Sequence, residues 1–167
     1  MTSPKEPARP PHISLSAEKL ISKGAPELHA MKAEALLRSD NNATPRSRAW
    51  VANRDNVIAA VAELLSGGMI FMTGERGVGK TQIAVCAMLD LIDEPDHFTR
   101  TRSSVRYIRA AEMFMAFRDA IKDGSERRLL AELSRPRILV IDDIHEQAGS
   151  ADEQRSLTLL LDKRLGA

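Results

Sequence analysis

The chain has 167 residues, 43% of them hydrophobic and with a formal net charge of +1, which suits one soluble domain with a short extension. This charge balance excludes a protein that binds nucleic acid through an overall basic surface, so any such contact must be local. The single cysteine, Cys86, excludes an internal disulfide framework and a zinc site built from several cysteines.

The N-terminal part predicts a leader followed by two helices. Residues 1–12 are rich in proline and hold almost nothing to bury, which is typical of a disordered leader. Residues 13–48 predict a helical extension and linker, with one helix over Ser16–Lys23 ended by Gly24 and a second from Pro26 to about Arg38. The second helix is expected to pack on the rest of the protein, or to bind a partner helix, through the stripe Leu28, Met31, Ala35 and Leu36.

The next stretch offers a basic cluster and a third helix. Arg46, Arg48 and Arg54 surround Trp50, an arrangement that is open to a solvated linker or to contact with nucleic acid or an acidic partner. Residues 55–66 carry an amphipathic pattern that Gly67-Gly68 ends. Because no apolar run approaches about 18 residues and the start lacks a signal-peptide pattern, we expect a cytoplasmic protein without a membrane partner.

A phosphate-binding pattern follows. After the apolar run Met69–Met72, which predicts a strand, the chain matches G-x-x-x-x-G-K-[ST] with Gly74, Glu75, Arg76, Gly77, Val78, Gly79, Lys80 and Thr81. A helix is predicted from near Lys80 through Gln82 to Leu89. Strand, loop and helix together predict a P-loop that binds ATP, with Gln82 as the last contacting residue.

The residue types in this loop have a chemical reason. Its glycines let the backbone curl so that N–H groups point at phosphate oxygens, and the following helix adds the positive end of its dipole. Lys80 is expected to reach the β- and γ-phosphates as a catalytic cation, and the Thr81 hydroxyl to bind Mg²⁺.

Three elements are predicted between the P-loop helix and the next motif. Val105–Ile108 reads as a strand, and about Glu126–Leu133 as a short helix before Pro136. Between them Ala110–Asp123 predicts a helix that Gly124 stops, with a core-facing stripe made of Met113, Phe114, Phe117 and Ile121.

A second motif is the aliphatic run Ile138–Ile141 followed by Asp142 and Asp143. A buried parallel strand reads like this, and ligands collect at the carboxyl ends of such strands. Paired with the P-loop, it predicts a Walker B element in which Asp142 holds Mg²⁺, mostly through water, opposite Thr81. Asp143 is the candidate base that orients and polarises the attacking water. Glu146 could share the role of Asp143, and His145 could sense the γ-phosphate, contact a partner, or have no special role.

These motifs resemble the DnaC/IstB group of AAA+ ATPases, which includes helicase loaders and ATPase helpers of transposases. The resemblance covers about residues 50–167 and is carried by residues 74–84, 105–113 and 139–143. It implies an α/β fold over residues 49–167, a P-loop NTPase of three α/β/α layers with a parallel sheet. It also implies ATP and Mg²⁺ as cofactors, homo-oligomers whose subunits complete the site, and DNA, single-stranded by expectation, with a replicative helicase or transposase as partners.

The group places a strand with a polar sensor residue after the helix that follows Walker B, whereas the sequence ends at Ala167. A sheet without this central strand would leave backbone hydrogen bonds unmade, so we expect an incomplete domain rather than a sheet that closes with Walker A beside Walker B. Two other classes of function stay open at this point. They are a P-loop kinase of small molecules or nucleotides, and a nucleotide-binding adaptor without turnover.

Overall fold

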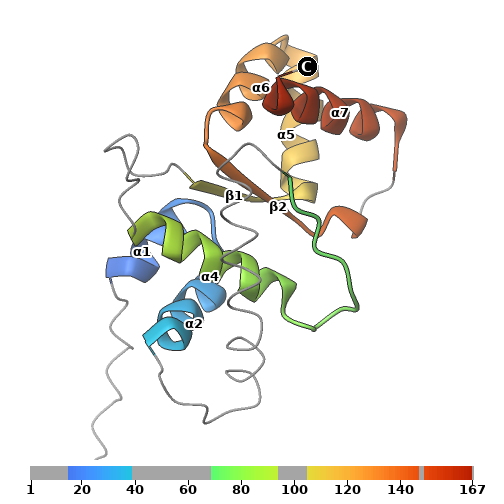
Figure 1. Ribbon diagram of the computed structural model, residues 1–167. Coiled ribbons are helices and arrows are strands. Elements are labelled where there is room, and N and C mark those ends of the chain that lie inside the picture. The colour runs from blue at the N-terminus through green and yellow to red at the C-terminus, as the bar shows by residue number, and fades with distance from the viewer. Residues whose placement is uncertain (1–14, 39–68, 94–104, 147–148, 167) are drawn as a thin grey trace, which may run out of the picture.

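The computed structural model describes residues 15–38, 69–93, 105–146 and 149–166 (Figure 1). The expectations for the leader, for the basic cluster around Trp50 and for a helix over residues 55–66 lie outside these ranges. Among the described residues, no helix has both the length and the apolar character needed to cross a membrane.

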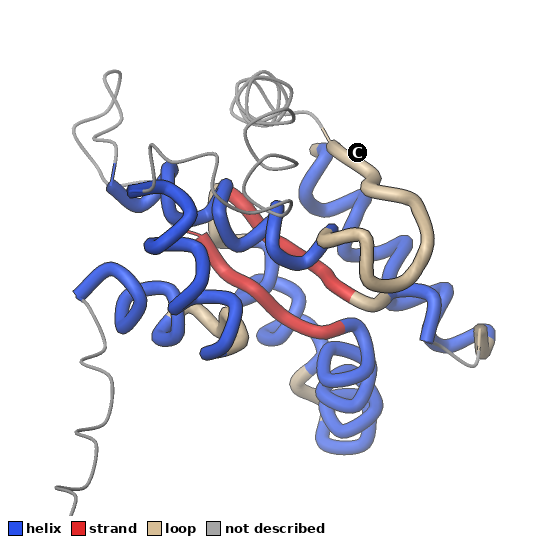
Figure 2. The backbone as a smooth tube through the Cα atoms, turned by 90° about the horizontal axis from the view of Figure 1, so that it is seen from below, coloured by secondary structure: helices blue, strands red, loops and turns tan. Residues whose placement is uncertain are grey.

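A pair of parallel strands forms the centre of the molecule. Strand β1 (Val105–Arg109) pairs with β2 (Ile138–Asp142) in a register that sets Val105 opposite Ile138 and Arg109 opposite Asp142. The two strands lie side by side in Figure 2 with helices around them. Two of the predicted strands, Val105–Ile108 and Ile138–Ile141, are confirmed, and each extends one residue beyond its predicted end.

Helices cover both faces of this sheet (Figure 1). Helices α1 (Leu15–Ser22), α2 (Glu27–Arg38) and α4 (Lys80–Asp93) pack together on one face. Helices α5 (Ala110–Asp123), α6 (Glu126–Ser134) and α7 (Ala151–Leu165) cover the other, and the short 3₁₀ helix η1 (Ile144–Glu146) follows β2. The predicted α/β arrangement with helices on both sides of a parallel sheet is confirmed.

The alternation of side chains along the strands divides the core into two clusters. One cluster, on the α4 side, includes Val105, Tyr107 and Ile138 from the strands with Leu20, Ala30, Ala33, Val85 and Met88 from the helices. The other, on the α5 side, takes Ile108, Leu139 and Ile141 from the strands and packs them on Met113, Phe114, Phe117, Leu133 and Leu160. Each strand therefore supplies both cores, as expected for a sheet buried on both faces.

The α1–α2 hairpin is built onto the sheet edge. Gly24 turns the chain at φ 94°, and the carbonyl of the preceding Lys23 accepts a 2.8 Å hydrogen bond from the backbone N–H of Tyr107 in β1. A Cβ at Gly24 would overlap the carbonyl oxygen of Tyr107, so the close approach requires glycine. The hairpin thus occupies a backbone donor on the edge of β1 that faces away from β2.

Two predicted apolar stripes are partly wrong. On α2 the buried residues are Ala30 and Ala33, whereas Leu28 is 61% exposed, because the small alanines allow α2 close to α4. The side chains of Ala35 and Leu36 lie outside the described part. On α5 the predicted residues Met113, Phe114 and Phe117 are buried. Ile121, however, is 47% exposed, and Ala120 is buried instead.

The predicted strand at Met69–Met72 is wrong for this structure. These residues form no strand, and Phe71 is 72% exposed. A strand is held by hydrogen bonds to a neighbour, and in the described ranges β1 and β2 pair only with each other. The alternative of Walker A beside Walker B is therefore also not realised.

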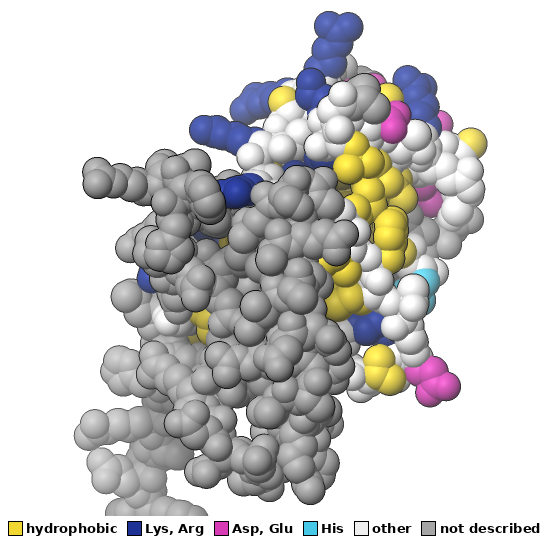
Figure 3. All heavy atoms as spheres, viewed as in Figure 1, with side chains coloured by type: hydrophobic (Ala, Val, Ile, Leu, Met, Phe, Trp, Pro, Cys, Tyr) yellow, Lys and Arg dark blue, Asp and Glu magenta, His cyan; other side chains and the backbone are white. Residues whose placement is uncertain are grey.

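Hydrophobic side chains gather in a band on the face shown in Figure 3, and Met69 and Met72 are among the exposed apolar residues.

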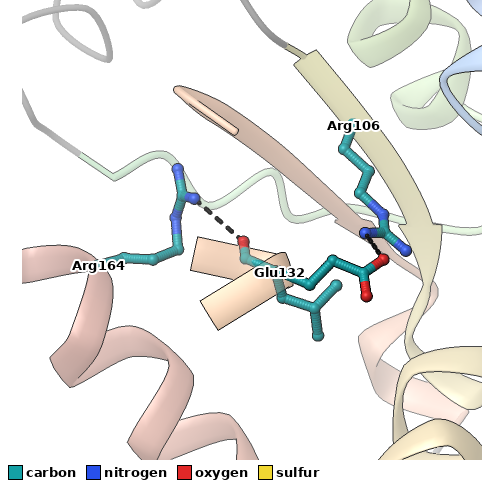
Figure 4. A network of polar contacts seen from close by, with 4 residues as sticks. Arg106, Glu132 and Arg164 are labelled. Atoms are coloured by element: carbon teal, nitrogen blue, oxygen red, sulfur yellow. Dashed lines mark hydrogen bonds and ion pairs between the residues drawn. The ribbon is translucent and has the colours of Figure 1, made fainter. Parts of the chain in front are cut away.

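Polar contacts fix the α6 layer to its surroundings (Figure 4). Arg106 of β1 forms a 2.7 Å ion pair with Glu132 of α6. From α7, the guanidinium of Arg164 donates to the carbonyls that end α6 and lead into β2, at 3.3 Å to Leu133, 3.4 Å to Ser134, 2.8 Å to Pro136 and 2.9 Å to Arg137. Arg164 therefore serves as the cap of a helix end that would otherwise leave carbonyls unpaired.

Candidate nucleotide-binding site

The glycine-rich loop leads directly into the first turn of α4. Gly77 and Gly79 have φ values of 85° and 100°, a region that other residues rarely enter, so glycine is needed at both positions. Helix α4 begins at Lys80, as predicted, and the first N–H groups of a helix have no partner within it. The loop residues 74–78 are exposed, so the backbone donors and the helix end are open to an anion.

Lys80 lies across this loop. Its Nζ donates to the carbonyl oxygens of Gly74 at 2.9 Å and Glu75 at 2.8 Å. The ammonium group thus sits between the start of the loop and the start of α4. Its place fits the predicted role toward the phosphates.

Thr81 and Asp142 meet although 61 residues separate them in the chain. The Thr81 hydroxyl donates to Oδ2 of Asp142 at 2.7 Å. The Tyr107 hydroxyl donates to the same oxygen at 2.5 Å, and the backbone N–H of Asp143 donates to Oδ1 at 3.0 Å. Donors from α4, from β1 and from the residue that follows β2 therefore fix one carboxylate beside the P-loop.

The protonation of this cluster follows from its hydrogen bonds. Burial by itself raises the pKa of Asp142, but the bonds from Tyr107 and Thr81 outweigh it and hold the pKa below its usual value of 3.8. Burial and the bond to Asp142 raise the pKa of Tyr107 above its usual value of 10.0. At neutral pH the carboxylate is ionised and the phenol is protonated.

This donor set fits a hard divalent cation. Ionised carboxylate and hydroxyl oxygens are the ligands that Mg²⁺ prefers, and it keeps water and substrate phosphates as its remaining ligands. In the described part of the chain, no group of three or more His, Cys, Asp or Glu side chains gathers to hold a metal. Thr81 and Asp142 offer two suitable oxygens, and a bound nucleotide and water would supply the remaining ligands of Mg²⁺.

Asp143 directly follows β2, at the edge of the sheet where Asp142 contacts Thr81. Its φ of 57° lies in the left-handed region, which is uncommon for a residue other than glycine. Such strained positions are often found at functional sites. His145 is exposed in η1, and the side chain of Glu146 lies outside the described part.

The side chain of Gln82, the last predicted nucleotide contact, is engaged by α2. Its Nε2 donates to the carbonyl of His29 at 3.1 Å, and its Oε1 accepts from His29 Nδ1 at 2.9 Å. Cys86 is buried one turn further along the same helix. The α1–α2 hairpin thus contacts the first turn of the P-loop helix through His29.

Two residues near the site were missed by sequence reasoning. Tyr107 was assigned only to a strand, although the alternation of Val105, Tyr107 and Arg109 puts it on the face of β1 that bears Asp142 in β2. His29 carries no signal in the sequence, because its place depends on how α2 packs across α4.

Comparison with known families agrees with this geometry. Residues 43–167 match the family described as IstB-like ATP binding protein. The chain belongs to this family. It is therefore an ATP-binding protein of the AAA+ class, and residues 74–81 with Asp142 lie within the matched part. No curated protein and no solved structure matched the chain.

The family match also sets the hairpin apart. Helices α1 and α2 end at Arg38, before the matched residues begin, and yet they contact Gln82 and Tyr107 inside the matched part. Contacts to the site therefore also come from residues that precede the matched part of the chain.

Proposed function

We propose that this IstB-like protein hydrolyses ATP to ADP and phosphate at the P-loop. The observation that carries the proposal is the 2.7 Å contact between Thr81 and Asp142, which brings the two Walker motifs together. Asp143 follows at the end of β2, where a general base is needed. A P-loop threonine and an aspartate at the end of the Walker B strand are the residues that hold Mg²⁺ in P-loop NTPases. Many ATPases with this layout carry glutamate at the position of Asp143, whose side chain is one methylene shorter.

Each group has a separate task in this reaction. The loop N–H groups and the end of α4 bind the phosphates, and Lys80 leaves the carbonyls of Gly74 and Glu75 to pair with the β- and γ-phosphates. Mg²⁺, when bound, supplies charge that neutralises the phosphate oxygens during transfer. The Asp143 carboxylate orients the attacking water and accepts its proton.

The wider role that we propose is that of a helicase loader or a transposase helper on DNA. Support comes from membership of the IstB-like family and from the resemblance of the sequence to the DnaC/IstB group. We further propose single-stranded DNA as the nucleic acid, a replicative helicase or transposase as the protein partner, and homo-oligomers as the acting form.

The test is a phosphate-release assay on the full chain, with and without single-stranded DNA. We expect ATP hydrolysis that DNA stimulates, and an Asp143→Asn variant that keeps ATP binding but loses most of the turnover. Removing a general base lowers rates by about 10²–10⁴-fold. Asp152→Asn, which removes a carboxylate from the exposed first turn of α7, is the matched control and should hydrolyse normally.

Two outcomes would refute the proposal. Binding of ATP without phosphate release, even with DNA and partner present, would identify an adaptor without turnover. Transfer of phosphate to a small acceptor, with no effect of DNA, would identify a kinase. If Asp143→Asn hydrolyses ATP at the normal rate, the assignment of Asp143 as the base is wrong.

A further inference from the structure

The hydroxyl of Tyr107 makes the shortest contact to the Walker B carboxylate. The side chain is buried in β1, with 4% of its surface exposed, and donates to Asp142 Oδ2 at 2.5 Å. The hydroxyl of Thr81 donates to the same oxygen. A buried tyrosine hydroxyl needs a hydrogen-bond partner, and a backbone carbonyl could serve as one. Here the partner is the carboxylate that lies beside the P-loop.

The main chain of Tyr107 is fixed as firmly as its hydroxyl. Its N–H donates to the carbonyl of Lys23 in the hairpin turn, and its own carbonyl lies against Gly24, so close that no Cβ fits between them. The hairpin therefore holds the middle of β1 from the side opposite to β2. Contacts run without a break from the α1–α2 turn through Tyr107 to the Asp142 carboxylate.

We propose that Tyr107 is a positioning residue for Mg²⁺ binding, and that the α1–α2 hairpin holds it in place. This inference rests on the assignment of Asp142 and Thr81 as the residues that hold Mg²⁺, and it does not depend on hydrolysis. The Tyr107 hydroxyl acts through Asp142: it fixes the orientation of the carboxylate before the cation binds, so that the Asp142 and Thr81 oxygens are presented together.

The physical reason is the freedom that a single aspartate side chain would otherwise have. With the N–H of Asp143 on Oδ1 and two hydroxyls on Oδ2, the carboxylate is held at both oxygens. Because Thr81 is assigned to the cation, its hydroxyl would turn away from Oδ2 when Mg²⁺ binds, and Tyr107 would then be the hydroxyl that still holds this oxygen. Without Tyr107 the carboxylate would be freer to rotate in the bound state, and ordering it would oppose metal binding. Partners that orient metal ligands typically change metal affinity about 10–100-fold when removed.

The test is Tyr107→Phe, which keeps the ring and removes only the hydroxyl. The affinity of the full chain for a fluorescent ATP analogue is titrated at increasing Mg²⁺ and also in EDTA. We expect the Mg²⁺ concentration at half-maximal enhancement of binding to rise about tenfold, at the lower end of the range for such partners. The affinity in EDTA should stay unchanged, because the phosphate cradle is intact.

Ser134→Ala is the matched control. It removes a hydroxyl that donates at 2.7 Å to Leu130, within α6 on the other face of the sheet. Its Mg²⁺ midpoint should equal that of the wild type. A midpoint for Tyr107→Phe within twofold of the wild type would overturn the inference, and so would an equal rise in both variants.

A second measurement needs no variant. Tyr107 is the one tyrosine in the sequence, so tyrosine labelled with ¹³C at Cζ gives a single resonance next to the hydroxyl. We expect this resonance to move when Mg²⁺ is added to the ATP-bound wild-type protein, and a resonance that stays fixed would overturn the inference. If the ATP affinity of the wild-type protein does not depend on Mg²⁺, this inference and the proposed function are both wrong. If ATP binding depends on Mg²⁺ but no ATP is hydrolysed, only the proposed function is wrong.

Discussion

Replacing Gly24 by alanine should displace the α1–α2 turn from β1 and destabilise the protein. Gly24 has a φ of 94°, and a Cβ there would overlap the Tyr107 carbonyl oxygen. The left-handed conformation alone costs an alanine about 1–2 kcal/mol. Moving the turn away would also break the bond from the Tyr107 N–H to Lys23 and leave a buried donor unpaired, at about 1–3 kcal/mol. We therefore expect a loss of about 2–5 kcal/mol in the free energy of unfolding.

Gly124 provides a control that separates these two costs. It has a φ of 75° at the C-terminal end of α5, but a Cβ there would meet nothing within 4 Å. Gly124→Ala should therefore lose only the conformational part, about 1–2 kcal/mol. Urea unfolding followed by circular dichroism measures both variants under the same conditions. Equal losses for the two variants would refute the claim that the hairpin presses on β1.

Two further predictions concern the polar contacts. Because the pKa of Tyr107 is raised in the folded state, its hydroxyl should stay protonated around pH 10.0, where the unfolded chain ionises. Absorbance at 295 nm reads this ionisation. The protonated hydroxyl therefore stabilises the folded state fully below pH 10.0, and this contribution is lost as the pH rises through the folded pKa. A folded protein that ionises normally would contradict the buried bond to Asp142. Arg164→Leu should lower the melting temperature by about 4–8 °C, since bonds from a partly exposed guanidinium to carbonyls contribute about 2 kcal/mol. Arg155→Leu, on the exposed face of α7, should change it little, and equal shifts would show that Arg164 acts through charge alone.

The local motifs could be predicted from the sequence because each depends on neighbouring residues. The start of α4 at Lys80 follows from the glycine loop, and β2 from a run of aliphatic residues that ends in aspartate. The meeting of Thr81 with Asp142 could be predicted as well, because a P-loop and a Walker B strand end at the same edge of a parallel sheet.

What could not be predicted depends on contacts between distant segments. The apolar run at Met69–Met72 has strand composition, but a strand also needs a neighbour, and neither described strand pairs with it. Leu28 was expected to be buried, yet the alanines of α2 face α4 because small residues allow the closer approach. The alternation along β1 indicates the face on which Tyr107 lies, but its bond to Asp142 also depends on the pairing of β1 with β2. The contact of His29 with Gln82 arises from the packing of α2 on α4, which no local pattern encodes.

The most direct test of the nucleotide site is calorimetric titration of ATP with Mg²⁺ into the wild type and Lys80→Ala. Lys80 spans the loop at 2.9 Å from the Gly74 carbonyl, where phosphates would bind, and removing its charge should cost at least about 1.5–3 kcal/mol of binding. We expect tight binding by the wild type and an affinity reduced at least about tenfold in Lys80→Ala. The same affinity for both proteins would contradict the assignment of residues 74–81 as the phosphate site.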